Sequence, residues 1–234
     1  MRHQRQVLLI DADDTLWETN LNFERTLAAF HRLLTPLGYT EEHVRRQVEQ
    51  AERRNIQRRG YGAGSFLLTL EEVYLQLAGQ RAQPPHLEEI RRFSRLLLDA
   101  PPRLFDGVGD TLGYLAVRHR LFLFTKGNPT EQGGKVAASG LERYFEAWEV
   151  VPEKTEAAYR DLVERHRLPF GDVWMVGNSP RFDINPALAV GLNAVFIPAQ
   201  PSWEYENEEI RRSPEASGGR LLVLKSFPEL CAHF

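Results

Sequence analysis

The chain has 234 residues, enough for one large domain or two smaller ones, and its 42% hydrophobic and 26% charged residues are ordinary for a globular protein. The net charge of -3 gives no reason to expect nucleic acid or a membrane surface as a partner. The chain has a single cysteine, so it cannot form an internal disulfide. We expect a cytoplasmic protein without a secretion signal or membrane span, either monomeric or homodimeric.

The first predicted element is the apolar run VLLI at residues 7–10, which is typical of a strand buried on both faces. The sequence DADDT follows it directly and contributes Asp11, Asp13 and Asp14. Aspartate is a favoured turn and helix-capping residue, so this cluster by itself is as consistent with a turn as with a functional group. The rest of the chain decides between a turn and a group of functional carboxylates.

Residues 17–105 contain no predicted strand. Apolar residues at helical spacing, with glutamate and arginine between them, predict four helices in this block. They are expected at Leu21–Leu34, Glu41–Arg58, Phe66–Ala78 and Leu87–Leu98, separated by turn sequences rich in glycine and proline. We therefore predict a helical domain inserted after the first strand, from which the chain returns through APPRLFDGV.

In the remainder of the chain, strand-like runs alternate with helix-like stretches. Strands are predicted at Leu121–Thr125, Trp148–Val151, Val173–Val176, Ala194–Ile197 and Leu221–Leu224, and helices at 130–139, 154–166, 182–190 and 227–232. This alternation predicts a parallel sheet flanked by helices. The predicted domains are an α/β domain formed by residues 1–16 and 106–234, and an all-α domain formed by residues 17–105.

Polar side chains follow four of the predicted strands. An open α/β sheet binds its ligands at the carboxyl ends of its strands, so we expect these side chains to meet at one edge. In chain order they are Asp11, Asp13, Thr125, Lys126, Lys154, Asn178 and Asp183.

This arrangement resembles the haloacid dehalogenase (HAD) superfamily, in particular its phosphatase branch with a helical cap inserted after the first strand. DADDT is similar to the family's DxDxT motif, FT to its strand-ending Ser/Thr motif, and GNSPRFD to its GDxxxxD motif. Lys154 lies upstream of the last motif, as the family's lysine does. The resemblance covers nearly the whole chain. It implies a Rossmann-like core, a cap domain and a Mg²⁺-dependent phosphatase acting on a small phosphorylated metabolite.

The resemblance also implies a role for each core residue. Asp11 would be the nucleophile that forms an aspartyl-phosphate, and Asp13 the general acid and base. Thr125 and Lys154 would bind the transferring phosphoryl group.

The implied metal site has a departure from the family pattern. Two carboxylates about 4 Å apart repel by roughly 4 kcal/mol at an effective dielectric constant near 20, so a cation must offset this repulsion. Hard oxygen ligands favour Mg²⁺ as that cation. The ligands would be the Asp11 carboxylate, the Asp13 backbone carbonyl and the GNSPRFD loop, with Asn178 and Asp183 as candidates. Asn178 stands where the family has aspartate, so it keeps a carbonyl oxygen but lacks a charge.

Several nearby residues allow two interpretations. Lys126 stands where many family members carry asparagine, and it is either a solvated lysine or a phosphate contact. Lys135 competes with Lys154 for the role of the phosphate-binding lysine, and Lys154 is preferred because it follows a strand. Thr15 and Asp14 are expected to hold the turn.

Two further segments are candidates for substrate recognition. The predicted cap contains the turn RRGYGAGS, where Arg59 and Tyr61 either contact the substrate or lie in a solvent-facing turn. The segment 200–219 is either a mobile surface loop or places Trp203 and Tyr205 at the mouth of the site.

Three other functions are weighed against the phosphatase. A 2-haloacid dehalogenase of the same superfamily needs no metal and has no aspartate two residues after its nucleophile, which disfavours it here. A phosphomutase shares the motifs and differs in the cap. A non-enzymatic binding protein is disfavoured because Asp11 and Asp13 are both present.

Overall fold

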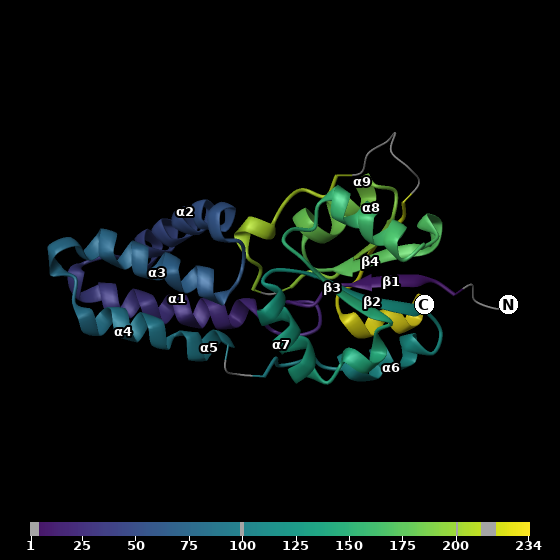
Figure 1. The fold of residues 1–234 in the computed structure, drawn as a ribbon, viewed down its shortest axis with the longest axis horizontal. Coiled ribbons are helices and arrows are strands. Elements are labelled where there is room, and N and C mark those ends of the chain that lie inside the picture. The colour runs from purple at the N-terminus through teal and green to yellow at the C-terminus, as the bar shows by residue number, and fades with distance from the viewer. Residues whose placement is uncertain (1–4, 99–100, 200, 212–218) are drawn as a thin grey trace. The chain divides into compact units, whose positions relative to one another are not determined.

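The computed structural model describes residues 5–98, 101–199, 201–211 and 219–234, and Figure 1 shows them as a ribbon. The chain divides into two compact units, one formed by Met1–Asn20 with Pro102–Phe234 and the other by Leu21–Pro101. The first is an α/β unit, whereas the second is helical. In the ranges described, no helix is both long and apolar enough to cross a membrane.

The α/β unit is built on a parallel sheet with the strand order β3-β2-β1-β4-β5-β6. Its strands are β1 (Val7–Ile10), β2 (Arg120–Lys126), β3 (Ala147–Val151), β4 (Val173–Gly177), β5 (Asn193–Phe196) and β6 (Leu221–Val223). Each lies within one residue of a predicted strand at both ends, which confirms the predicted sheet. Because β1 pairs with both β2 and β4, the acidic cluster after β1 lies in the middle of the carboxyl edge.

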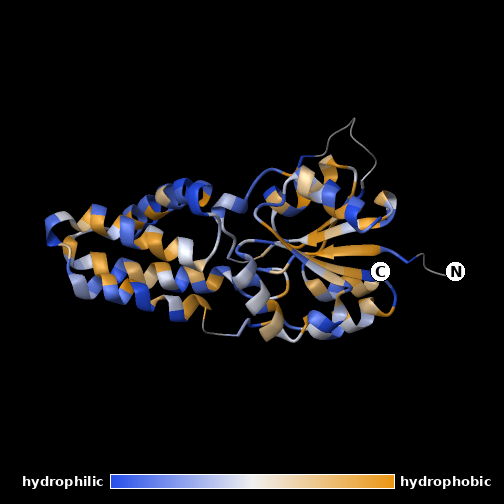
Figure 2. Cartoon of the chain, viewed as in Figure 1, coloured by the Kyte–Doolittle hydropathy of each residue, from blue (hydrophilic) through white to orange (hydrophobic). Residues whose placement is uncertain are grey.

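Helices cover both faces of this sheet. Alternate side chains of a strand point to opposite faces, so Leu8 and Ile10 join one hydrophobic cluster while Val7 and Leu9 join another. The first cluster includes residues of α6 (Val108–Ala116), α7 (Pro129–Ser139) and the 3₁₀ helix Phe227–Ala232, and the second includes residues of α8 (Glu156–Arg165) and α9 (Asn185–Ala189). Figure 2 shows the strands mostly in apolar colours, as expected for a sheet covered on both sides.

The sequence pattern does not predict helix α6. Gly109 and Gly113 lie inside it, and glycine is among the weakest helix formers. The helix is stabilised instead by tertiary packing, since Val108, Leu112 and Leu115 are buried in the cluster on one face of the sheet.

The predicted helix at 182–190 is also different in detail. A π-helical turn at Pro180–Ile184 comes first, and α9 follows it. The π turn carries Asp183, and π turns occur frequently at functional sites.

The helical unit has its own core. Its helices are α1 (Asn20–Leu34), α2 (Glu41–Arg59), α3 (Ala63–Ala78), α4 (Pro84–Arg92) and α5 (Ser94–Leu98). The single helix predicted for Leu87–Leu98 is wrong, because the chain forms α4 and α5 with a break at Phe93. The Phe93 N–H donates to the Ile90 carbonyl three residues back, at 3.1 Å, which is a 3₁₀-type bond.

The boundary between the units differs from the predicted 17–105. Trp17 forms backbone bridges with both Asp13 and Leu104, and its side chain is 1% exposed. This hydrophobic anchor joins both ends of the insertion to the α/β unit. The helical unit is therefore the shorter segment Leu21–Pro101.

Candidate active site

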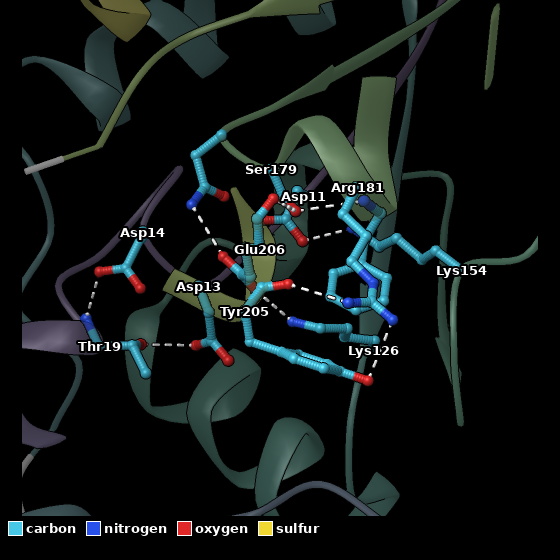
Figure 3. A network of polar contacts seen from close by, with 12 residues as sticks. Asp11, Asp13, Asp14, Thr19, Lys126, Lys154, Ser179, Arg181, Tyr205 and Glu206 are labelled. Carbon is cyan, nitrogen blue, oxygen red and sulfur yellow. Dashed lines mark hydrogen bonds and ion pairs between the residues drawn. The ribbon is translucent and has the colours of Figure 1, made fainter. Parts of the chain in front are cut away.

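A pocket lies at the carboxyl edge of the sheet, and all its lining residues belong to the α/β unit. They are Asp11, Asp13, Thr125, Lys126, Lys154, Asn178, Ser179, Phe182, Asp183 and Glu206. All seven residues singled out at the predicted strand ends are therefore brought together. Figure 3 shows most of them with their polar contacts.

Lys154 lies between the carboxylates of Asp11 and Asp183. Its Nζ is 2.5 Å from Asp11 Oδ1 and 2.7 Å from Asp183 Oδ1. All three side chains are buried, so the ammonium offsets the repulsion of two carboxylates held in a poorly solvated site. Burial raises the pKa of Asp11 to about 6, because desolvation outweighs the attraction of Lys154. Asp11 is thus mainly ionised at neutral pH, as a nucleophile requires.

Thr15 connects Asp11 to the fourth strand end. Its hydroxyl is 3.0 Å from Asp11 Oδ2 and 3.2 Å from Asn178 Oδ1, so one hydroxyl proton is shared between two acceptors. Thr15 therefore does more than hold the turn, because it draws two oxygen atoms from different strands toward one point.

Asp13 accepts four hydrogen bonds. Its Oδ1 lies 2.7 Å from Trp17 Nε1, 2.7 Å from Thr19 Oγ1 and 2.8 Å from Lys135 Nζ, while its Oδ2 lies 2.7 Å from Gln132 Nε2. Burial alone would raise the pKa of Asp13, but the charge of Lys135 and the hydrogen bonds outweigh it and hold the pKa well below its usual value. In this arrangement Asp13 is an anion, the form that accepts a proton.

Lys135 and Lys154 therefore contact different aspartates. Lys154 contacts the acid that is the predicted nucleophile, which is the position preferred for it from the sequence. Lys135, on α7, contacts Asp13 instead. Neither this contact nor that of Gln132 was predicted from the sequence, although both residues lie in the helix that follows Thr125.

Asp14 braces the loop after β1, as expected. Its backbone has a φ of 60°, which aspartate tolerates better than most residues. Its carboxylate accepts hydrogen bonds from the backbone N–H groups of Thr19 and Asn20, at 2.9 and 3.0 Å, where α1 begins. Burial nevertheless raises the pKa of Asp14 to about 7.

The GNSPRFD turn requires its glycine. A Cβ atom at Gly177 would lie far inside van der Waals contact with Asp183 Oδ2. This close approach lets Asp183 Oδ2 accept from the Ser179 N–H at 2.9 Å, and Ser179 Oγ in turn caps the π turn by accepting from the Phe182 N–H at 3.2 Å. Asp183 uses its other oxygen for Lys154, so both of its oxygen atoms are engaged.

Glu206 is a pocket residue that the sequence did not reveal. This residue comes from the segment after β5 and is buried, and its Oε1 lies 2.5 Å from Lys126 Nζ. Burial alone would lower the pKa of Lys126, but the charge of Glu206 outweighs it and raises the pKa above its usual value. Several glutamates are close together in WEYENEE, so the sequence gives no signal for which of them faces inward.

The segment 201–211 packs against the GNSPRFD turn. The Arg181 guanidinium lies over the Tyr205 ring, 4.0 Å from its centroid, and donates to the Tyr205 hydroxyl at 3.1 Å. Asn185 holds the same segment, since its Nδ2 donates to Glu208 Oε2 at 3.0 Å. For these residues the packing supports the interpretation that the segment borders the site, whereas Gln200 and residues 212–218 lie outside the described part of the chain.

The two residues predicted from the cap lie in the helical unit. Arg59 ends α2, and Tyr61 lies in the turn before α3. Among the described residues that line the pocket, neither is present. Their contact with a substrate stays a prediction.

The pocket offers a small set of oxygen ligands for a metal ion. Across the described ranges, no three acidic, histidine or cysteine side chains form a metal-binding group. Asp11 Oδ2 and Asn178 Oδ1, which converge on Thr15, are hard donors of the type that Mg²⁺ prefers. The residues present thus fit Mg²⁺ through Asp11 and Asn178, and the backbone carbonyl of Asp13 stays a predicted ligand. Asp183, the other predicted ligand, has both oxygen atoms engaged by Lys154 and the Ser179 N–H.

Comparison with solved structures supports the fold. A haloacid dehalogenase-like family hydrolase from Xanthomonas campestris is 28% identical, with a TM-score of 0.84 over 98% of this chain and 90% of that one. The HAD hydrolase YfnB from Bacillus subtilis, solved bound to magnesium, is 18% identical with a TM-score of 0.64, covering 98% of each chain. An L-2-haloacid dehalogenase from Xanthobacter autotrophicus, with chloropropionic acid covalently bound, is 15% identical with a TM-score of 0.59, also covering 98% of each.

Sequence comparison gives the family. No curated protein matches the chain. The haloacid dehalogenase-like hydrolase family matches residues 6–191, which include β1 to β4 and every motif at their carboxyl ends. With this match and the parallel sheet that carries the pocket, the chain belongs to the haloacid dehalogenase-like hydrolase family and is a hydrolase.

Proposed function

We propose that the protein is a Mg²⁺-dependent phosphatase that hydrolyses a small phosphorylated metabolite through an aspartyl-phosphate on Asp11. One observation carries the proposal: Asp13 lines the same pocket as Asp11, Thr125 and Lys154. A nucleophilic carboxylate, a second carboxylate for proton transfer and a cation for phosphoryl oxygens are the groups that phosphate-ester hydrolysis needs.

In the first step, an Asp11 oxygen attacks phosphorus and the bond from phosphorus to the leaving oxygen breaks. Lys154 has three N–H groups, of which two donate to Asp11 and Asp183, so the third can donate to a phosphoryl oxygen. Thr125, which is 1% exposed and lines the pocket, can donate its hydroxyl proton to the same group.

Asp13 moves the protons. It gives a proton to the leaving oxygen in the first step and takes one from the water that hydrolyses the aspartyl-phosphate in the second. The donors around Asp13 favour its ionised form, which suits the second step directly. For the first step Asp13 must carry a proton, so at least part of this donor set must move away from it. Among these donors, Lys135 lowers the pKa of Asp13 the most.

Mg²⁺ would be held by Asp11 Oδ2, Asn178 Oδ1 and the backbone carbonyl of Asp13. When bound, it would neutralise phosphoryl charge and reduce the repulsion between an anionic substrate and the carboxylates. Asp183 would act through Lys154, because its Oδ1 lies 2.7 Å from Lys154 Nζ and holds that ammonium beside Asp11.

Removal of divalent metal is expected to silence the enzyme. After dialysis against EDTA, hydrolysis of p-nitrophenyl phosphate should fall to background, and added Mg²⁺ should restore it. EDTA saturated with Mg²⁺ beforehand serves as the control and should have no effect. Full hydrolysis of p-nitrophenyl phosphate by the metal-free protein would overturn the Mg²⁺ dependence. Chloride release from a 2-haloacid without hydrolysis of any phosphate ester would overturn the phosphatase in favour of the dehalogenase.

Specificity is proposed to lie in the helical unit, acting as a cap. The pocket residues recognise a phosphoryl group, so other residues must recognise the rest of the substrate, which is the leaving group. We expect Arg59→Ala or Tyr61→Ala to lower kcat/KM for the best metabolite by at least about tenfold, roughly 1.4 kcal/mol. A small aryl phosphate makes few contacts beyond the phosphoryl group, so its kcat/KM should change much less.

A panel of phosphorylated metabolites first identifies the best substrate. The measurement is then kcat/KM of each variant and of the unmodified protein for that metabolite and for the aryl phosphate. Arg95→Ala changes another arginine on an exposed side of the helical unit and serves as the matched control. An equal response of both substrates, or none, would show that the turn between α2 and α3 is structural.

A phosphomutase would instead return a phosphorylated product without net release of phosphate.

A further inference from the structure

Glu206 lies beside the proposed metal ligands. Its Oε2 is 3.5 Å from Asn178 Nδ2, and Asn178 Oδ1 is joined through the Thr15 hydroxyl to Asp11 Oδ2. Figure 3 shows the Glu206 side chain close to Lys126. Glu206 is therefore the acid that reaches the amide side of the pocket, where Asn178 itself carries no charge.

Glu206 is held in place through both its side chain and its backbone. Its Oε1 contacts Lys126 Nζ at 2.5 Å, and its backbone carbonyl lies 3.5 Å from Ser179 Oγ. The side chains of both Lys126 and Glu206 are mostly buried, at 16% and 11% exposure. A charge fixed in a poorly solvated pocket acts on a nearby ion far more strongly than one in open solvent.

The charge balance of the pocket depends on Glu206. Its lining contains four carboxylates, on Asp11, Asp13, Asp183 and Glu206, and two ammonium groups, on Lys126 and Lys154. Lys135 adds a third ammonium through its pair with Asp13. Four negative charges against three positive ones leave one net negative charge, and without Glu206 the group would be neutral.

We propose that Glu206 supplies the carboxylate charge that Asn178 lacks, and that it sets the affinity of the pocket for Mg²⁺. The inference rests on the proposed function only in that this pocket binds Mg²⁺. It assigns the segment after β5 a part in the metal site, although that segment lies beyond the strand ends that carry the other ligands.

The test is calorimetric titration of the full chain with MgCl₂ in the absence of any substrate. Glu206→Gln is expected to raise the Kd for Mg²⁺ by at least about tenfold, because it removes one nearby negative charge while keeping the shape of the side chain. Glu204→Gln makes the same change two residues away on an exposed side chain and should change the Kd less than twofold. The double variant Asn178→Asp with Glu206→Gln returns a carboxylate to the site and should recover most of the lost affinity.

A second pair of variants covers the case in which Glu206→Gln unfolds because Lys126 is left buried without its acid. Lys126→Gln and the double variant Lys126→Gln with Glu206→Gln differ only in the charge of residue 206, and the double variant is expected to bind Mg²⁺ at least about tenfold more weakly. Equal Kd values within either folded pair would overturn the role of Glu206 while the phosphatase proposal stands. Weaker Mg²⁺ binding without turnover of any phosphate ester would support Glu206 and overturn the phosphatase. Absence of Mg²⁺ binding by the unmodified protein would overturn both.

Discussion

Asp11→Asn is expected to abolish turnover, with a loss of at least about 10⁴-fold in kcat for every phosphate ester. The amide is nearly the same size as the carboxylate but offers no anionic oxygen to attack phosphorus. The fold should survive, because Asp183 still pairs with the buried Lys154 ammonium at 2.7 Å. Initial rates with p-nitrophenyl phosphate in excess Mg²⁺ give the measurement, and circular dichroism gives the state of the fold.

Asp161→Asn is the matched control for this change. Asp161 lies on an exposed side of α8, so the same loss of a carboxylate should leave both the rate and the fold unchanged. If Asp11→Asn retains a rate close to that of the unmodified protein, the assignment of the nucleophile is wrong.

Asp13→Asn is expected to have the second-largest effect, about 10²–10⁴-fold, and its size should depend on the leaving group. An alkyl alkoxide leaves poorly without a proton, so hydrolysis of a sugar phosphate should lose the most. Nitrophenolate is a stable anion and leaves without one, so attack on p-nitrophenyl phosphate should be affected much less. The comparison of kcat/KM for the two substrates measures the acid role of Asp13.

The base role of Asp13 has its own signature. Without a group to take the proton from water, the aspartyl-phosphate on Asp11 should accumulate. Rapid mixing of Asp13→Asn with p-nitrophenyl phosphate should then give a burst of about one equivalent of nitrophenolate, followed by a slow phase. A variant with no burst and equal losses on both substrates would show that Asp13 only shapes the loop after β1.

The contacts of Asp13 explain why its position at the pocket could be predicted from the sequence but its ionisation could not. The spacing of Asp11 and Asp13 after a buried strand is local, and the strand rule places both at the ligand-binding edge. The donors Gln132 and Lys135 lie 119 and 122 residues away along the chain. Their contact depends on how α7 packs against the sheet, which the helix periodicity does not specify.

The sequence by itself determined the sheet and the residues at its edge. The neighbouring strands β1, β2 and β4 each contain four consecutive apolar residues, so each is visible locally, and parallel strands bring their carboxyl ends to one edge. Thus the sequence alone was enough to place Thr125, Lys154 and Asn178 together, and they line one pocket. The insertion was visible for the same reason, because helical periodicity replaces strands over that block.

Only the tertiary structure decided which polar residues outside the strand ends join the site. Glu206 contacts Lys126, which is 80 residues away in the sequence. The neighbouring glutamates in WEYENEE have the same side chain and a similar local sequence, so the sequence does not distinguish Glu206 from them. Helix α6 forms against its own weak propensity because the sheet buries its apolar side. Periodicity along a chain encodes which side of an element is buried, whereas the pairing of charges depends on distances between elements, and these exist only once the chain has folded.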